Sequence, residues 1–184
     1  MISGPRKKWE EITREERYFT GVLFHDMRSH PGPVLALLVG KLKLPERTTI
    51  EDMGFEVCFF RDAAFEGLMK RERHLEKQTF DLSVILSDQR MVIVEAKAQQ
   101  DFDTEQLDNL VHAKSLIEGG RLWSVETVNL VALFSSRYRP RSETLAYFDA
   151  TFNWNDIAHL YPENQDIYWR ADSIYGDKPR VALV

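Results

Sequence analysis

Cysteine is almost absent from this sequence, and long hydrophobic segments are missing altogether. The single cysteine, Cys58, excludes an internal disulfide and a cysteine-rich zinc site. The longest apolar stretches, such as 34–39 and 130–134, are far shorter than the roughly 20 residues that a transmembrane helix needs. The N-terminal segment also lacks the apolar core of a secretory signal. We therefore expect a cytoplasmic protein with no membrane partner.

An excess of positive charge is missing as well. The sequence has 24 Lys and Arg residues against 29 Asp and Glu residues, which gives a net charge of −5. A protein that binds nucleic acid tightly is usually basic, because neutralising phosphates supplies much of its affinity. The acidic balance argues against a high-affinity DNA-binding protein, but less against an enzyme whose active site contains carboxylates. Local basic clusters at 6–8, 70–74 and 137–141 are typical of a solvated surface.

Several common catalytic motifs are not found. The five histidines have no metal-ligand spacing, and no Gly-x-Ser-x-Gly motif surrounds Ser135 and Ser136. No glycine-rich phosphate loop is present, so nucleotide hydrolysis is not expected. Some aromatic residues could stack on bases, but such residues more often belong to the core; they are Trp123, Trp154, Trp169 and Tyr168.

What the sequence does contain is an alternation of helical and strand patterns. A capping box, Thr13 with Glu16 three residues later, predicts a helix that runs to about Met27 and stops at the prolines near 31–33. Further helices are predicted at 34–42, in the first part of 62–77, at 103–117 and at 154–160. Strands are predicted at 55–60, 81–86, 91–97, 127–134 and 146–151.

The order of these elements predicts the fold class. The strands at 81–86 and 91–97 form a β-hairpin, and the helix after 91–97 leads to a strand that is apolar throughout. Such a crossover makes a right-handed parallel unit. We therefore predict an α/β fold with a mixed central β-sheet and helices on both sides. One domain is expected over 1–184, with its core at about 14–134 and an extension at about 135–184.

Charged residues end the otherwise apolar strand 91–97. Because side chains alternate along a strand, Glu95 and Lys97 point to one side and Ala96 to the other. The simple explanation is an ion pair that reaches solvent at the end of the strand. The alternative is a catalytic site, and it requires a further polar group on the same side.

Asp81, on the partner strand, can supply that group in only one hairpin register. It faces Glu95 and Lys97 when the numbers of paired residues have an even sum, which a three- or five-residue loop gives. A two-residue Asp88-Gln89 loop would give the odd sum, but it lacks the glycine or asparagine that such turns prefer. The sequence therefore favours the even register.

Two carboxylates beside an ammonium group suit metal-assisted phosphodiester hydrolysis. Mg²⁺ prefers oxygen ligands and retains several waters, so it needs few protein ligands. It would contact a phosphate oxygen and lower the pKa of a bound water. Lys97 would orient or deprotonate the attacking water and add positive charge beside the transition state.

The pattern of Asp81, the 13 residues 82–94, and Glu95-Ala96-Lys97 resembles the PD-(D/E)XK nuclease superfamily, which has the restriction-endonuclease-like fold. That core consists of a helix, three antiparallel strands, a helix and a strand, an order similar to 14–134, about two thirds of the chain. The resemblance implies that Asp81 and Glu95 bind metal and that Lys97 serves catalysis. Phe80 stands where the family's name has proline.

The resemblance also implies two further site residues. The first helix of the family often contributes a glutamate, for which Glu16 is the best match and Glu15 the next. The capping box offers Glu16 a purely structural role. Gln106 matches a glutamine that family members often place near the site, although a capping arrangement over 103–106 would also explain it.

Two functions are therefore expected as alternatives. The first is a metal-dependent nuclease that uses Mg²⁺, with Mn²⁺ as a substitute, and cleaves DNA rather than RNA; its metal ligands would be Asp81, Glu95 and Glu16. The second is a regulatory or nucleic-acid-binding module that keeps the fold without turnover, as the acidic charge would favour. A homodimer is a further possibility, with the tail at 175–184 as a candidate contact.

Overall fold

The computed structural model describes residues 13–71 and 78–177. The helices are α1 (Glu16–Ser29), α2 (Pro31–Leu42), α3 (Phe59–Phe65), α4 (Thr104–Gly120), α5 (Ser142–Leu145), α6 (Trp154–Leu160) and α7 (Gln165–Ser173), with 3₁₀ turns η2 (Leu122–Ser124) and η3 (Pro162–Asn164). The strands are β1 (Ile50–Val57), β2 (Phe80–Leu86), β3 (Arg90–Lys97), β4 (Thr127–Phe134) and β5 (Ala150–Asn153).

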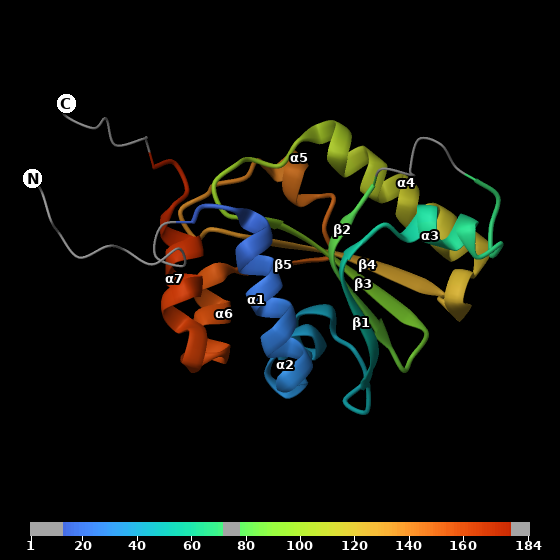
Figure 1. Ribbon diagram of the computed structural model, residues 1–184, viewed down its shortest axis with the longest axis horizontal. Coiled ribbons are helices and arrows are strands. Elements are labelled where there is room, and N and C mark those ends of the chain that lie inside the picture. Colours follow the sequence, from blue (N-terminus) through green and yellow to red (C-terminus); the bar gives the residue numbers. More distant parts are fainter. Residues whose placement is uncertain (1–12, 72–77, 178–184) are drawn as a thin grey trace, which may run out of the picture.

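The strands form one mixed sheet in the order β1-β2-β3-β4-β5. The pairs β1–β2 and β2–β3 are antiparallel, whereas β3–β4 and β4–β5 are parallel. Helix α4 makes the crossover from β3 to β4 (Figure 1). The predicted α/β class with a mixed sheet is confirmed.

Helices cover both faces of the sheet (Figure 1). On one face, α1, α2, α6 and α7 enclose the larger core, in which Phe19, Leu38, Trp154 and Tyr168 are almost completely buried. On the other face, α4 packs its Leu107, Leu110, Ala113 and Ile117 against the odd-numbered apolar residues of β3. The sheet is therefore buried on both sides where β3 and β4 lie, as the continuous apolar sequence of β4 predicts.

Two predicted strands differ from the structure. The strand predicted at 55–60 ends at Val57, and the buried Phe59 and Phe60 begin α3 instead. Their rings contact Phe80 at the start of β2, so packing outweighs the preference of aromatic residues for strands. The strand predicted at 146–151 is β5, displaced towards the C-terminus, and the helix α7 was not predicted.

Helix ends also differ from expectation. Helix α1 begins at Glu16 rather than directly after Thr13, and the side chain of Thr13 accepts a bond only from the backbone N–H of Glu15, at 3.3 Å. The predicted capping box is therefore wrong. The glycines at 119 and 120 lie inside α4, whose last turn is closed by Arg121 in a left-handed conformation. The helix predicted at 154–160 is confirmed, and Asn153 caps its N-terminus.

No helix within the described ranges is long and apolar enough to cross a membrane. The basic cluster at 6–8, part of the cluster at 70–74 and most of the tail at 175–184 lie outside the described residues. The segment after β4 contributes Trp154 and Tyr168 to the larger core, where their rings lie nearly parallel. These two aromatic residues have a core role, whereas Trp123 and Trp169, the other two considered for base stacking, are substantially exposed.

Candidate functional site

The β2–β3 hairpin has the register that the catalytic hypothesis requires. Leu82 pairs with Val94 and Leu86 with Arg90, so the numbers of paired residues have an even sum. The loop has three residues, and its last one, Gln89, adopts a left-handed conformation with φ of 62°. This is the usual backbone of a three-residue hairpin loop. Extending the register by one residue brings Asp81 to Glu95.

Asp81 is fixed by the backbone of β3. Its Oδ2 accepts a hydrogen bond of 2.8 Å from the backbone N–H of Ala96, and its side chain is partly exposed. The carboxylate therefore lies beside the Glu95-Ala96-Lys97 segment with its other oxygen available to a ligand.

Glu95 and Lys97 form a buried ion pair. The two residues are 1% and 8% exposed, and 2.6 Å separates Lys97 Nζ from Glu95 Oε1. Gln106, on α4, donates a hydrogen bond of 2.5 Å to the same oxygen. The second oxygen, Oε2, is buried and has no hydrogen-bond partner among the described residues. One carboxylate oxygen thus has two donors, and the other has none.

Glu16, the first residue of α1, reaches the same cluster from the opposite side of the sheet. Its Oε2 accepts a hydrogen bond of 2.8 Å from the backbone N–H of Ala98, and its Oε1 lies 3.5 Å from Lys97 Nζ. Glu15 is exposed and serves only as the N-terminal cap residue. Of the two glutamates, Glu16 is therefore the one placed at the cluster.

Gln106 combines the two roles considered for it. Its backbone N–H donates to Asp103 Oδ1 at 3.1 Å, so Asp103 caps α4 as predicted. Its side chain at the same time points inward to Glu95. Asp103 therefore holds the first turn of α4 in place, and with it the side-chain amide of Gln106 that contacts Glu95.

Burial dominates the electrostatics of the cluster. It raises the pKa of Asp81, and the neighbouring charge of Glu95 adds to that effect. Burial likewise raises the pKa values of Glu95 and Glu16, although the ammonium of Lys97 partly opposes it. For Lys97 burial disfavours the charge, but Glu95 and Glu16 outweigh it and raise the pKa. Lys97 is therefore a protonated ammonium at neutral pH.

An open polar groove leads to Asp81 and Gln106. Its volume is about 470 Å³, and its other walls come from the residues before β2 and the first turns of α4. Several lining residues carry carboxylates or amides; the full lining is Gln78, Thr79, Asp81, Asp103, Glu105, Gln106 and Asn109. This acidic lining attracts cations, and a phosphate would require a cation beside it to enter.

The fit of a metal ion can be judged from these contacts. No group of three or more His, Cys, Asp or Glu side chains within 13–71 and 78–177 is arranged to hold a metal. A Mg²⁺ site, however, can rest on one or two carboxylates and several waters. The unpartnered Oε2 of Glu95 and the available oxygen of Asp81 are hard oxygen donors of the required kind. Both residues therefore offer the kind of oxygen that Mg²⁺ binds.

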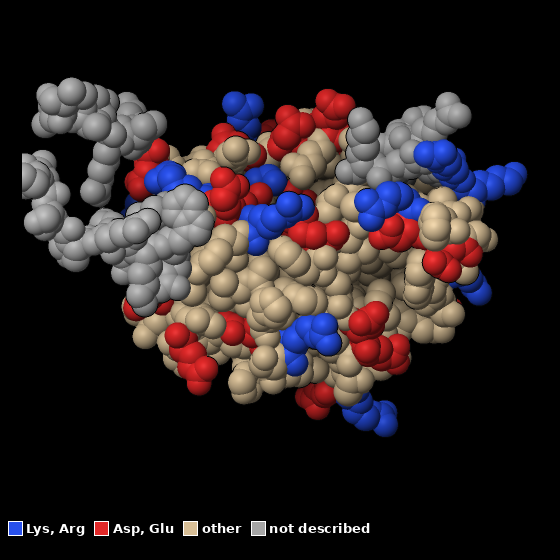
Figure 2. Space-filling view, in the orientation of Figure 1, with Lys and Arg blue, Asp and Glu red and all other residues tan. Residues whose placement is uncertain are grey.

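The structure adds residues around the cluster that the sequence analysis missed. Arg17, with a side chain 72% exposed, forms an ion pair with Glu56 at 2.5 Å, and this pair, with a smaller contribution from the charge of Asp81, raises the pKa of Arg17. Figure 2 shows charged side chains of both signs gathered at the N-terminal end of α1. Trp154 donates a hydrogen bond of 3.0 Å to the backbone carbonyl of Lys97. These contacts join segments far apart in the chain and have no local sequence signal.

A scan of protein-family models, a search of curated proteins and a search of solved structures each found no match to this chain. The structure brings all five predicted site residues together: Glu16, Asp81, Glu95, Lys97 and Gln106. They come from α1, β2, β3 and α4, so four elements converge at one end of the sheet.

Proposed function

We propose that the chain is a metal-dependent nuclease of the PD-(D/E)XK type, acting on DNA. The observation that carries the proposal is the unequal environment of the two Glu95 oxygens. A buried polar atom without a partner costs about 1–3 kcal/mol, and more when it is charged. A bound cation would remove that cost, which is why we infer that Oε2 of Glu95 is a metal ligand.

A plain ion pair explains the cluster less well. It accounts for the contact of Glu95 with Lys97, but not for the convergence of Glu16 and Asp81 on the same few atoms. Each added buried carboxylate destabilises the folded chain through desolvation and repulsion. An unfavourable group of this kind is typical of a functional site.

Asp81 and Glu95 would hold Mg²⁺ in this proposal. The bound ion would supply positive charge beside the phosphate and lower the pKa of a water. Glu16 serves best as a positioning residue, because both its oxygens are already engaged, by the backbone N–H of Ala98 and by Lys97. Gln106 positions Glu95 in the same way from α4.

Lys97 would contribute charge rather than act as the base. Its raised pKa keeps the ammonium protonated at neutral pH, so it can donate hydrogen bonds to the attacking water or to a phosphate oxygen. Donors fixed where negative charge develops are among the strongest contributions to catalysis. The carboxylates of Glu95 and Glu16 hold the ammonium in place before substrate arrives.

The order of elements supports the same family. Helix α1, the antiparallel strands β1, β2 and β3, helix α4 and the parallel strand β4 follow one another as in the restriction-endonuclease-like core. DNA as substrate follows from that resemblance. A silent binding or regulatory module is the second candidate, favoured by the net charge of −5 and by the acidic groove.

The decisive test is a cleavage assay with labelled DNA and RNA in Mg²⁺, in Mn²⁺ and in a chelator. We expect metal-dependent cleavage of DNA that falls by about 100-fold or more in Lys97→Ala, as for loss of a fixed donor to the transition state. Lys114→Ala is the matched control, because Lys114 pairs with Asp149 on the outside of α4. Equal activity in wild type and Lys97→Ala would refute the mechanism. Absence of cleavage with retained metal binding would favour the silent module.

A further inference from the structure

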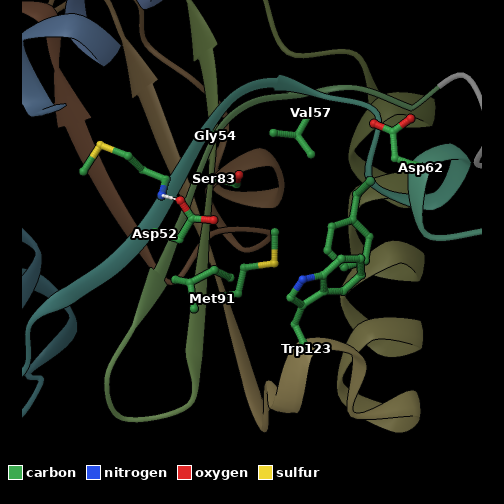
Figure 3. A pocket seen from close by; sticks show the side chains of 10 residues that line it. Asp52, Gly54, Val57, Asp62, Ser83, Met91 and Trp123 are labelled. Carbon is green, nitrogen blue, oxygen red and sulfur yellow. Dashed lines mark hydrogen bonds between the residues drawn. The ribbon is translucent and has the colours of Figure 1, made fainter. Parts of the chain in front are cut away.

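A second hollow lies on the α3 side of the antiparallel strands, next to the edge strand β1 (Figure 3). Its volume is about 160 Å³. Most of its wall is apolar; the apolar lining consists of Met53, Val57, Phe59, Ile85, Met91 and Trp123. It is separate from the polar groove at Asp81, since none of its lining residues lines that groove.

Ser83 places a hydroxyl at the wall of this cavity. The residue is 7% exposed, and its hydroxyl has no hydrogen-bond partner within residues 13–71 and 78–177. Gly54 lies opposite it on β1 and keeps the space open. A Cβ at Gly54 would come within 2.9 Å of Ser83 Oγ and 2.3 Å of Val57 Cγ2. The cavity thus contains a polar atom that a ligand could satisfy.

Trp123 stands at the mouth of the cavity on strained backbone. The residue is 51% exposed, and its ring contacts Phe59 at a centroid distance of 4.9 Å. Arg121, Trp123 and Ser124 all have left-handed backbone, with φ of 47°, 55° and 59°. Such conformations cost free energy for residues other than glycine, and they concentrate at functional sites. The strained turn presents an uncovered indole ring beside an apolar hollow.

We propose that this cavity binds a single pyrimidine base, with cytosine preferred. A cavity of about 150 Å³ holds one benzene ring, so this one accepts one six-membered ring but not a purine. The indole of Trp123 offers a stacking surface, which every base can use. The polar groups at the wall that can still accept a hydrogen bond are the hydroxyl of Ser83 and the carboxylate of Asp52, of which only Oδ1 is engaged, by the backbone N–H of Met53. The third polar residue, Asp62, is paired with Arg61. A carboxylate accepts hydrogen bonds from the amino group of cytosine, which thymine lacks.

The cavity is placed to hold a nucleotide of the strand being cut, and in this respect the inference rests on the proposed function. Ser83 follows Asp81 by two residues on β2, about 7 Å at the rise of a strand. Met91 precedes Glu95 by four residues on β3, or about 13 Å. At about 3.4 Å per nucleotide, these distances correspond to two to four nucleotides from the scissile phosphate.

The first experiment measures binding of free nucleosides by calorimetry, without any cleavage. We expect deoxycytidine to bind more tightly than thymidine and deoxyadenosine not to bind. Trp123→Ala should weaken deoxycytidine binding by roughly tenfold or more, the loss expected for one stacking contact. Trp169→Ala is the matched control, because Trp169 is 44% exposed on α7 and lines no part of the cavity. Ser83→Ala should weaken binding by a smaller factor.

The outcomes separate this inference from the proposed function. Deoxycytidine binding that Trp123→Ala abolishes and Lys97→Ala retains supports the cavity, even when the protein cleaves nothing. Tight binding of deoxyadenosine, or no effect of Trp123→Ala, overturns it. Metal-dependent cleavage of DNA with no nucleoside binding, and with the same rate in Trp123→Ala, overturns the cavity and leaves the nuclease standing.

Discussion

Asp26 and Glu95 each receive several hydrogen bonds, and they differ in how these bonds are shared between the two carboxylate oxygens. Asp26, on α1, is fully satisfied: Asn164 donates to Oδ1 at 2.8 Å, and Tyr168 donates to Oδ2 at 2.6 Å. Glu95, on β3, has both its donors on one oxygen and none on the other. The Asp26 network fastens α1 to the C-terminal helices. Asp88, in the hairpin loop, also has one buried oxygen without a donor, but Glu95 alone of the two has further carboxylates beside it, those of Asp81 and Glu16.

Both groups join residues remote in the sequence, but Glu95 is 1% exposed whereas Asp26 is half-buried. They also differ in whether each carboxylate oxygen has a hydrogen-bond donor. A network in which every oxygen has its donors contributes rigidity, whereas a buried oxygen left without a donor costs free energy that binding can recover.

Neutral substitutions of Glu95 and Asp26 are expected to have the largest effects, and opposite ones. Glu95→Gln is expected to lower kcat for DNA cleavage by about 100-fold or more, because it removes a metal ligand and a partner of Lys97. It should cost little stability, because the amide oxygen can still accept the hydrogen bonds of Lys97 and Gln106, and Lys97 keeps the carboxylate of Glu16 beside it. The measurements are kcat in Mg²⁺ and the free energy of unfolding in urea.

Asp26→Asn is the matched variant and should behave in the opposite way. An asparagine loses one acceptor, so the donors of Asn164 and Tyr168 are no longer both satisfied. We expect a loss of about 1–3 kcal/mol in the free energy of unfolding and no change in kcat. If both variants lost activity and stability together, satisfaction of the oxygens would not separate the two regions.

The effects of pH and of metal ions on thermal stability are expected to be intermediate in size. Burial and the charge of Glu95 raise the pKa of Asp81 to about 8. For a raised carboxyl pKa, the stability from the protonated form is present below the unfolded value and is lost as pH rises towards 8. The metal-free protein should therefore lose thermal stability between pH 5 and about pH 8.

Mn²⁺ should reverse this loss, because a metal binds the ionised carboxylates. At 100 times its Kd a ligand adds about 2.7 kcal/mol, which raises the Tm of a chain of this size by about 5–10 °C. We expect that increase at pH 8 and a much smaller one at pH 5, measured by thermal denaturation with and without a chelator. Asp81→Asn should flatten both profiles, while Asp26→Asn should leave the increase intact. An increase equal at both pH values would contradict the two-carboxylate site.

Local patterns made a large part of the site predictable. Alternation along β3 placed Glu95 and Lys97 on one side, and the helix after it carried Gln106. The register of the β2–β3 hairpin could not be fixed from the sequence, because glutamine, unlike glycine or asparagine, does not indicate a left-handed turn position. The structure settles it through the three-residue loop.

The features that could not be predicted from the sequence depend on contacts between residues far apart in the chain. Glu16 fits a capping box perfectly well in sequence, but the backbone N–H of Ala98 and the ammonium of Lys97 draw its carboxylate away from the helix end. Phe59 starts α3 because its ring packs against Phe80, a contact that no local window contains. Ser83 looks like any strand residue, and only the opposing Gly54 reveals the cavity. A sequence pattern describes one helix or strand at a time, whereas each of these features is a contact between two elements.

The smallest expected effect concerns the loop that sets the register on which the Glu95 cluster depends. Gln89 occupies a left-handed conformation with φ of 62°, which disfavours side chains and which glycine adopts freely. Gln89→Gly should therefore raise the free energy of unfolding by about 0.5 kcal/mol, since relief of strain exceeds the added flexibility of the unfolded chain only slightly. Neither kcat nor the Asp26 network should change, because the loop lies at the far end of the hairpin from Asp81. Urea denaturation of this variant beside Ser87→Gly, whose position is not left-handed, makes the test specific. A stabilisation by both substitutions, or by neither, would show that the strain at Gln89 does not contribute to stability and that the register is fixed by the paired strands themselves.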